Sequence, residues 1–560
     1  AFLPIKPKIV AWGADPIHVN FDDKRMKEKL SGYKNLEVEF LASNVWMLTA
    51  TERFLYRNPE YQTAVCVDIE GKPIVPGWLD SEYNGVKPWW GCTNNPLYRE
   101  LLIKRALGGI RNGANMLHLD DHMGTAAAAS HAGGCFCDYC MKGFNAWLKE
   151  NFSTKELSEM GIKNIADFNY SEMIKNLGYI TKEKYLQAVT ENKIPLREEF
   201  MKYQLYEAAE FVKELGLVAA KEAGTFIPVG VNSWNLAPTQ LATSHYADYF
   251  SNEVSHFDVE DLNPPFVYLL GNALGKPVFS TGTGEDWIYI NQKGAPVRVQ
   301  RWIATAYAFG QYFMYSYNKW GFSEKTGTQW YQIPIEIYEP LCSFINQNPQ
   351  LFDGYEPYEQ VGILYENEVC RKNDREIKSI VKKLNETNVP IGLVASGDTW
   401  LKRDLTLESL NRFKYLILSE KTNLSENEKV LIDKFAENHP VFSWIGEEEV
   451  LQKIPNLLKV TNAEKVWALP RIKEEDGEIT GLVVHLLNQD YDAEKDKMNR
   501  KTDFMVFLSN DLLSGLSEKD VRFYSPENEP VLLKSIKSDK GIYVSIPFLD
   551  LWGLLVLETK

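Results

Sequence analysis

Two adjacent carboxylates and three closely spaced cysteines share one short segment, HLDDHMGTAAAASHAGGCFCDYC, residues 118 to 140. Asp120 and Asp121 are side by side, and Cys135, Cys137 and Cys140 form a C-x-C-x-x-C pattern. Carboxylates can transfer protons or attack an electrophilic carbon, whereas clustered thiolates suit a metal ion. Since the chain has only seven cysteines, this trio indicates thiolate chemistry rather than a disulfide framework.

A fourth thiol, Cys92, lies upstream of the trio. Four thiolates close a tetrahedral zinc site with no open position, so the expected zinc is structural. Two alternatives stand beside this prediction: the thiols are unligated core residues, or His131 replaces one of them as a ligand. If the zinc site exists, it fixes the loop that carries Asp120 and Asp121, and catalytic groups need such fixed placement.

Length and charge limit what this segment can belong to. A chain of 560 residues exceeds one hydrophobic core, so two or three domains are expected. A formal net charge of −15 argues against a nucleic-acid partner, and no apolar run is long enough to span a bilayer. The first residues lack a basic stretch followed by an apolar one, so no signal peptide is expected within this chain; a cytoplasmic and a periplasmic location both stay open.

The first part of the chain alternates apolar runs with helical patterns, which favours a TIM (β/α)8 barrel over residues 1–355. Clear helical periodicity covers 98–111, 198–222 and 297–310. Eight strands are predicted, and they are Lys8–Trp12, Leu36–Leu41, Ala64–Asp68, Met116–Asp120, Ile227–Asn232, Tyr249–Glu253, Val278–Thr281 and Tyr312–Tyr317. In such a barrel the chemistry lies on the loops that follow the strands.

Two further domains follow. Residues 356–459 alternate strands with helices and predict a small doubly wound α/β domain. Residues 460–560 show short alternating strands separated by turn residues, which predicts a C-terminal β-sandwich. The charged stretch 491–501 reads as a solvated hairpin loop.

Acids, amides and aromatic rings follow the predicted barrel strands, and this mixture suits a neutral polyhydroxylated ligand. The four candidate catalytic carboxylates are Asp120, Asp121, Glu253 and Glu285, although an Asp at such a junction often caps a helix and the Glu residues could form ion pairs. Paired carboxylates are what cleavage of a glycosidic bond requires. The candidate sugar contacts are Asp15, His18, Asn20, Trp46, His122, Asn232, Trp234, Trp287, Tyr317 and Trp320.

The lone cysteine, the acidic strand end, the C-x-C-x-x-C motif and the helix start at Gly143-Phe-Asn-Ala-Trp-Leu together resemble the family 42 β-galactosidases of glycoside hydrolase clan A. The resemblance extends to the order of domains. It implies a TIM barrel, a flavodoxin-like middle domain that drives homotrimer formation, and a small C-terminal β domain. It also implies zinc bound by Cys92, Cys135, Cys137 and Cys140.

This sequence departs from the catalytic pattern of that family in two ways: an Asp replaces a Glu, and Glu285 lies a few residues beyond the predicted strand end. The family's Asn-Glu pair falls on Asp120-Asp121, so an Asp stands where the general acid/base Glu is expected, and its nucleophile corresponds best to Glu285. The first assignment is therefore Asp121 as acid/base and Glu285 as nucleophile or base, with Asp120 holding sugar hydroxyls. The alternatives are an α-type glycosidase with an Asp nucleophile and Glu253 as acid/base, and a carbohydrate-binding pseudoenzyme. The sugar, the anomer and the stereochemical course stay open.

Overall fold

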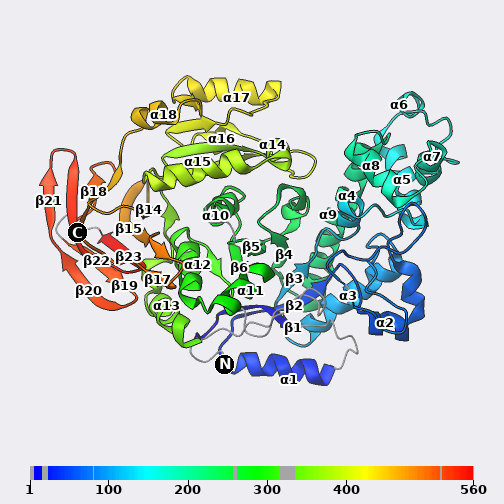
Figure 1. Ribbon diagram of the computed structural model, residues 1–560, viewed down its shortest axis with the longest axis horizontal. Coiled ribbons are helices and arrows are strands. Elements are labelled where there is room, and N and C mark those ends of the chain that lie inside the picture. The colour runs from blue at the N-terminus through cyan, green and yellow to red at the C-terminus, as the bar shows by residue number, and fades with distance from the viewer. Residues whose placement is uncertain are drawn as a thin grey trace.

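The computed structural model describes residues 5–14, 23–79, 81–256, 262–315, 335–517 and 520–558. A parallel sheet wrapped by helices lies at the centre, a second small parallel sheet lies beside it, and antiparallel sheets form the C-terminal end (Figure 1). Within the described ranges, no helix combines the length and apolarity needed to cross a bilayer.

The central sheet is curled and wholly parallel, and its seven strands follow one another in chain order. Parallel strands in sequential order, joined by helical crossovers, are the pattern of a TIM-like barrel. The prediction of a mixed α/β fold is thus confirmed, and the sheet is a curled half-barrel, consistent with a TIM barrel, with seven strands rather than eight in the described residues. They are β1 (Ile9–Ala14), β2 (Phe40–Trp46), β3 (Met116–Asp120), β4 (Val229–Trp234), β5 (Tyr249–Val254), β6 (Val278–Gly282) and β7 (Tyr312–Phe313).

The missing strand is the predicted one at 64–68. Its residues are buried, but they follow a 3-10 helix over Pro59–Ala64 and make only single bridges, for example between Val65 and Gly91. The apolar run reflects burial inside a long loop, which a strand pattern cannot distinguish from burial in a sheet. The strand predicted at 36–41 was also placed too early, because β2 begins at Phe40.

Helices surround the sheet, and the chain segment that connects β3 to β4 forms a helical lobe at one end of the molecule (Figure 1). The lobe comprises α4 (Gly124–His131), α5 (Asp138–Asn151), α6 (Thr154–Glu159), α7 (Tyr170–Asn176), α8 (Lys182–Thr190) and α9 (Arg197–Ala223). The remaining helices of this part are α1 (Asp23–Lys34), α2 (Glu52–Arg57), α3 (Pro96–Arg111), α10 (Asn263–Ala273), α11 (Gly284–Lys293), α12 (Pro296–Ala308) and α13 (Ile335–Gln347).

Side chains that alternate along the strands fill the interior of the barrel. At the amino ends Ala42, Met116 and Tyr249 form a small apolar cluster. Two residues further along each strand come Asn44, His118 and Ser251, all essentially inaccessible to solvent. Two residues further again, at the carboxyl ends, come Trp46, Asp120 and Glu253. The barrel therefore becomes more polar toward the rim where chemistry is expected.

The small parallel sheet has the order β10-β9-β11-β12, which is the order of a doubly wound sheet. Its strands are β9 (Val361–Glu366), β10 (Ile391–Ser396), β11 (Tyr415–Leu418) and β12 (Val441–Ser443), and its helices are α14 (Asn367–Lys372), α15 (Arg375–Glu386), α16 (Leu407–Leu410), α17 (Glu426–Ala436) and α18 (Glu447–Lys453).

Two antiparallel sheets share one apolar core at the C-terminal end. The sheet β13-β18-β22-β21 contains Leu458–Thr461, Lys501–Ser509, Gly541–Leu549 and Ser535–Ser538 in that order. The sheet β20-β19-β23-β15-β14-β8 contains Asn528–Leu533, Val521–Ser525, Trp552–Glu558, Glu478–Asn488, Val466–Glu475 and Glu356–Pro357. A shared core between two such sheets is the arrangement of a sandwich.

The charged stretch 491–501 is a hairpin without buried residues, as predicted, and it also contacts the barrel. It forms the hairpin of β16 (Tyr491–Asp492) and β17 (Lys497–Met498), and Asp496 at its tip accepts hydrogen bonds from Val297 N at 3.0 Å and Arg298 N at 3.1 Å. Asp496 thereby caps the first turn of α12, which favours a negative charge. The charges of this stretch therefore connect the C-terminal sheets to the barrel.

Candidate active site

The two aspartates stand at the carboxyl end of β3, beside the end of β2. Trp46 lies opposite Asp120 in the parallel register, and the Trp46 indole N–H donates a hydrogen bond to Asp121 Oδ2 at 2.8 Å. Asp121 has a φ of 51°, a left-handed conformation that most residues avoid. Its carbonyl accepts from Gly124 N at 2.9 Å. Backbone and side chain of Asp121 are thus both held.

An amide on β4 links two of the four candidate carboxylates. Asn232 Nδ2 lies 2.8 Å from Asp120 Oδ1 and 3.4 Å from Glu253 Oε1. Because both distances start from one nitrogen, the two carboxylate oxygens lie at most about 6 Å apart, a limit that admits the roughly 5–5.5 Å typical of retaining glycosidases. The structure therefore brings Asp120 and Glu253 together across β4.

Two of these carboxyl groups hold their protons unusually strongly. Burial, and next the charge of Asp120, raise the pKa of Glu253 to about 8. Burial and the charge of Asp120 likewise raise the pKa of Asp121 to about 8, against the hydrogen bond from Trp46. Near neutral pH, Asp121 and Glu253 can therefore donate a proton, and Asp120 is the charge that both of them face.

Glu285 occupies a different setting. It is exposed in the first turn of α11, and its charge contributes to the raised pKa of Glu253. The N-cap of this helix is Thr283, which forms a capping box with Asp286, whose carboxylate accepts from Thr283 Oγ1 at 2.9 Å. Glu285 thus lies close enough to act electrostatically on the site, but the amide link joins Glu253, not Glu285, to Asp120.

Two of the ten predicted sugar contacts, Trp46 and Asn232, hydrogen-bond the aspartates, and the other eight divide into three groups. Trp234 at the end of β4 is 53% exposed and stands beside Glu253 in register, so its ring is free to contact a ligand. His122 and Trp287 are instead buried: His122 Nδ1 lies 2.6 Å from Thr243 Oγ1, and Trp287 packs edge-on against Trp302. These two predictions are wrong as sugar contacts, because neither side chain reaches solvent. Asp15, His18, Asn20, Tyr317 and Trp320 lie outside the described residues.

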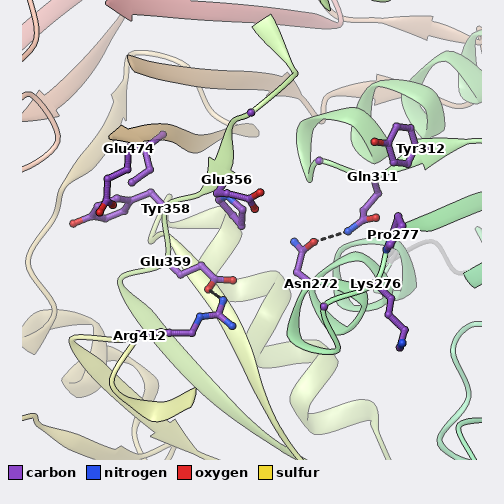
Figure 2. A pocket seen from close by; sticks show the side chains of 15 residues that line it. Asn272, Lys276, Pro277, Gln311, Tyr312, Glu356, Tyr358, Glu359, Arg412 and Glu474 are labelled. Atoms are coloured by element: carbon purple, nitrogen blue, oxygen red, sulfur yellow. Dashed lines mark hydrogen bonds and ion pairs between the residues drawn. The ribbon is translucent and has the colours of Figure 1, made fainter. Parts of the chain in front are cut away.

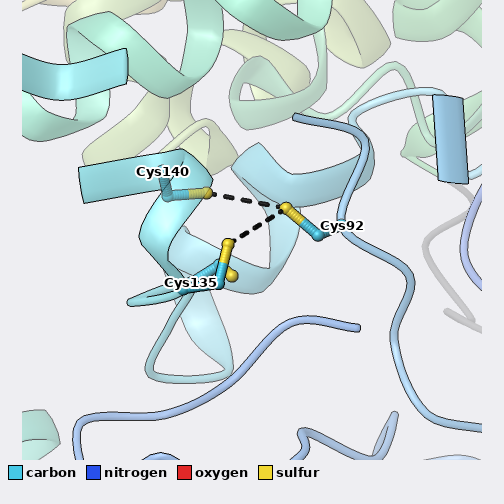
Figure 3. A group of neighbouring side chains, drawn as sticks. Cys92, Cys135 and Cys140 are labelled. Carbon is cyan, nitrogen blue, oxygen red and sulfur yellow. Dashed lines mark hydrogen bonds between the residues drawn. The ribbon is translucent and has the colours of Figure 1, made fainter. Parts of the chain in front are cut away.

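The four predicted metal ligands converge, and Figure 3 shows three of them, Cys92, Cys135 and Cys140, pointing toward one another. The sulfur atoms of Cys92, Cys135, Cys137 and Cys140 all lie within 4.8 Å of one another, and Cys92 Sγ is 3.6 Å from the sulfurs of both Cys137 and Cys140. Tetrahedral zinc with bonds of about 2.3 Å needs sulfurs about 3.8 Å apart, so the donor set fits. His131 is not part of it, since its ring packs against Trp90.

The structure also connects the cysteines to the aspartates, which the sequence pattern did not reveal. Thr125 Oγ1 lies 3.7 Å from Cys92 Sγ and accepts from Thr93 N at 2.8 Å. Thr93 Oγ1 in turn accepts from Thr125 N at 3.2 Å. This reciprocal pair fastens the start of α4, and hence the turn after Asp121, to the segment that carries Cys92. Two hydroxyls 32 residues apart carry no sequence signal for such a pair.

A fifth thiol was also missed. Cys66 is fully buried beside this group, and its Sγ lies 3.5 Å from the Gly91 carbonyl and 3.9 Å from Thr125 Oγ1. It comes from the long loop at 64–68 that sequence reasoning took for a strand. No spacing relative to the C-x-C-x-x-C motif marks it.

Known proteins resemble this chain only distantly in sequence. No family model matches the chain. Two curated proteins named α-agarase, from Thalassotalea agarivorans and Alteromonas agarilytica, are each 22% identical to it, over 446 and 438 residues. The alignments take in 76% of this chain but only 29% and 30% of the relatives, so the chain spans less than a third of their length.

Among solved structures, α-L-fucosidase isoenzyme 2 from Paenibacillus thiaminolyticus matches with a TM-score of 0.62 at 12% identity, covering 96% of this chain and 90% of the fucosidase. At that identity the likeness shows the fold. The sequence relatives are thus proteins named α-agarase, the fold is that of the fucosidase, and neither comparison supports the family 42 resemblance.

Proposed function

We propose that this chain is a retaining glycoside hydrolase in which Asp120 is the nucleophile and Glu253 is the general acid/base. The observation that carries the proposal is the shared amide of Asn232, which keeps the two carboxyl groups within about 6 Å of each other. This is the α-type arrangement considered beside the first assignment from the sequence. It replaces the pair of Asp121 and Glu285, for which no such link supports a joint role.

The reaction follows from the protonation states. Asp120 attacks the anomeric carbon while Glu253, protonated because burial and Asp120 raise its pKa, gives its proton to the departing sugar oxygen. The product of this step is a glycosyl ester of Asp120 and a free hydroxyl. Glu253, now ionised, then takes a proton from water as that water attacks the same carbon and releases Asp120. Two inversions give net retention.

The substrate we propose is an agar-type polysaccharide or its oligosaccharides, on the strength of the names of the two sequence relatives. The exposed ring of Trp234 beside Glu253 supplies a surface on which a sugar can stack. Asn232, shared between the two carboxyls, is positioned to hold a hydroxyl of the ring that is being cleaved.

Incubation with agar oligosaccharides, followed by proton NMR of the first product formed, tests this function. We expect the newly formed anomeric signal to have the configuration of the cleaved bond, since the mechanism has two displacements. Initial formation of the opposite anomer would contradict the role of Asp120 as nucleophile. Binding without any cleavage would instead support the carbohydrate-binding pseudoenzyme.

The rate should also depend on pH in a way that reports Glu253. Because the proton donor must be protonated and its pKa is about 8, we expect kcat/KM to fall tenfold per pH unit above about pH 8. Asp121, whose pKa also lies at about 8, becomes charged over the same pH range and then opposes ionisation of Glu253, so Asp121→Asn should move the alkaline limb to lower pH. An alkaline limb near pH 4.5, or one that Asp121→Asn leaves in place, would contradict this assignment.

A structural zinc at the four cysteines belongs to the same proposal. Its supporting observation is the all-sulfur donor set, which offers no open position for a substrate. Bound there, zinc would hold the Cys92 segment against the α4 start through Thr93 and Thr125. The homotrimer implied by the family 42 resemblance stays a proposal as well, which light scattering at micromolar concentration tests.

A further inference from the structure

A cavity lies at the opposite end of the barrel from the carboxylates. Its volume is about 800 Å³, and its lining comes from all three parts of the chain. One wall holds Asn272, Gln311 and Tyr312 near the amino ends of β6 and β7, and the facing wall holds Glu356, Tyr358 and Glu474 (Figure 2). The cavity lies at the amino end of β6, whereas Glu285 and the other candidate carboxylates lie at the carboxyl ends of the strands. Because β6 has five residues, the cavity and the carboxylates are on the order of 15 Å apart.

The charges of this cavity exclude several ligand classes. Glu359 and Arg412 neutralise each other as an ion pair. The other charged residues of the lining are Lys276, Glu356 and Glu474, so negative charge exceeds positive charge by one. Such a lining does not favour phosphate or another anion. It is not arranged for a metal either, because the only convergent metal-binding group among the described residues is the cysteine cluster.

The polar groups that remain are fixed in place. Gln311 Oε1 accepts from Val278 N at 2.6 Å, and Gln311 Nε2 donates to Asn272 Oδ1 at 2.5 Å. The Tyr312 ring is stacked on Phe279 with 4.9 Å between centroids, yet 42% of the Tyr312 residue surface stays exposed. Tyrosine rings, amides and carboxylates held in one cavity present stacking faces and hydrogen-bonding groups together.

We infer that this cavity is a second carbohydrate site, which binds a neutral segment of the polysaccharide away from the bond that is cleaved. The inference rests on the proposed function for the identity of the ligand. Its volume lies in the upper part of the roughly 300–1,000 Å³ range of ligand pockets, so it has room for more than one sugar ring. A second contact with one polymer raises the effective concentration of substrate at the rim.

Titration calorimetry with a neutral agar hexasaccharide tests the inference on the full chain carrying Asp120→Asn, which prevents turnover. We expect two binding sites per chain. Tyr312→Ala should weaken one of them at least tenfold, whereas Tyr312→Phe, which keeps the ring, should retain both. Glu474 is exposed on strand β14, so Glu474→Ala tests whether the facing wall contributes to binding without disturbing the barrel core.

A stoichiometry of one in the parent, or unchanged binding in both Tyr312→Ala and Glu474→Ala, would overturn the inference. A Tyr312-dependent site in a chain that cleaves no glycoside would leave the inference standing and remove the proposed function. Cleavage by a chain that binds the hexasaccharide at only one site would leave the proposed function standing and remove the inference. A thermal melt of Tyr312→Ala separates loss of the site from loss of the fold.

Discussion

Replacing Asp120 by Asn is expected to lower kcat by about a thousandfold or more, because an amide cannot form the glycosyl ester. Glu253→Gln should lower kcat to a similar degree on substrates whose leaving group needs protonation. Both substitutions keep the size of the side chain and its ability to hydrogen-bond Asn232. Folding should therefore be intact, which circular dichroism and thermal melting can check.

Added azide distinguishes the two roles. In Glu253→Gln, azide can attack the ester on Asp120 without base assistance, so a glycosyl azide of retained configuration should form. In Asp120→Asn, azide can only take the place of the nucleophile, so any glycosyl azide should have inverted configuration. A retained glycosyl azide from Asp120→Asn and an inverted one from Glu253→Gln would show that Glu253 is the nucleophile and Asp120 the acid/base.

Glu285→Gln is the matched control for the assignment that the family 42 resemblance implies. If Asp120 and Glu253 carry the chemistry, this exposed residue should change kcat by less than tenfold, and the NMR product should stay the same. A thousandfold loss in Glu285→Gln with near-normal turnover in Asp120→Asn would return the nucleophile to Glu285 and refute our pairing.

The second large effect is expected at the cysteines. Cys137→Ser removes one of four ligands at the only half-buried cysteine of the group, so it should cost little in packing. We expect zinc content to fall from one ion per chain to near zero, because zinc sites in small domains bind with about 10–16 kcal/mol of apparent free energy that depends on the full ligand set. Melting temperature and turnover should fall together, because the Cys92 segment of the cluster is hydrogen-bonded to Thr125, which lies in the first turn of α4, just after Asp121.

Cys370→Ser is the matched control, because it makes the same chemical change at a buried thiol outside the cluster. It should leave the zinc content unchanged. Metal analysis of the unmodified chain that found no zinc, with all four thiols titrating freely, would contradict the metal site. Turnover unaffected by Cys137→Ser despite loss of zinc would show that the cluster does not position the aspartates.

Local spacing determined part of this site. The C-x-C-x-x-C pattern lies within six residues around the start of one helix, so a short turn suffices to bring its sulfurs together. The run Met116–Asp120 is a strand of the predicted length, and a strand end of a barrel places Asp120 at the rim whatever the rest of the chain does. These features could be predicted because neighbouring residues decide them.

Only the tertiary structure decided which of the candidate carboxylates lie together. Asn232 is 112 residues from Asp120 in the chain, and its hydrogen bonds select Glu253 over Glu285. The same holds for Trp234 and Trp287, which look alike in the sequence, although packing buries one and leaves the other half exposed. Pairing and burial depend on the register between distant strands and on the helices packed behind them, and a single sequence encodes these only through the complete fold.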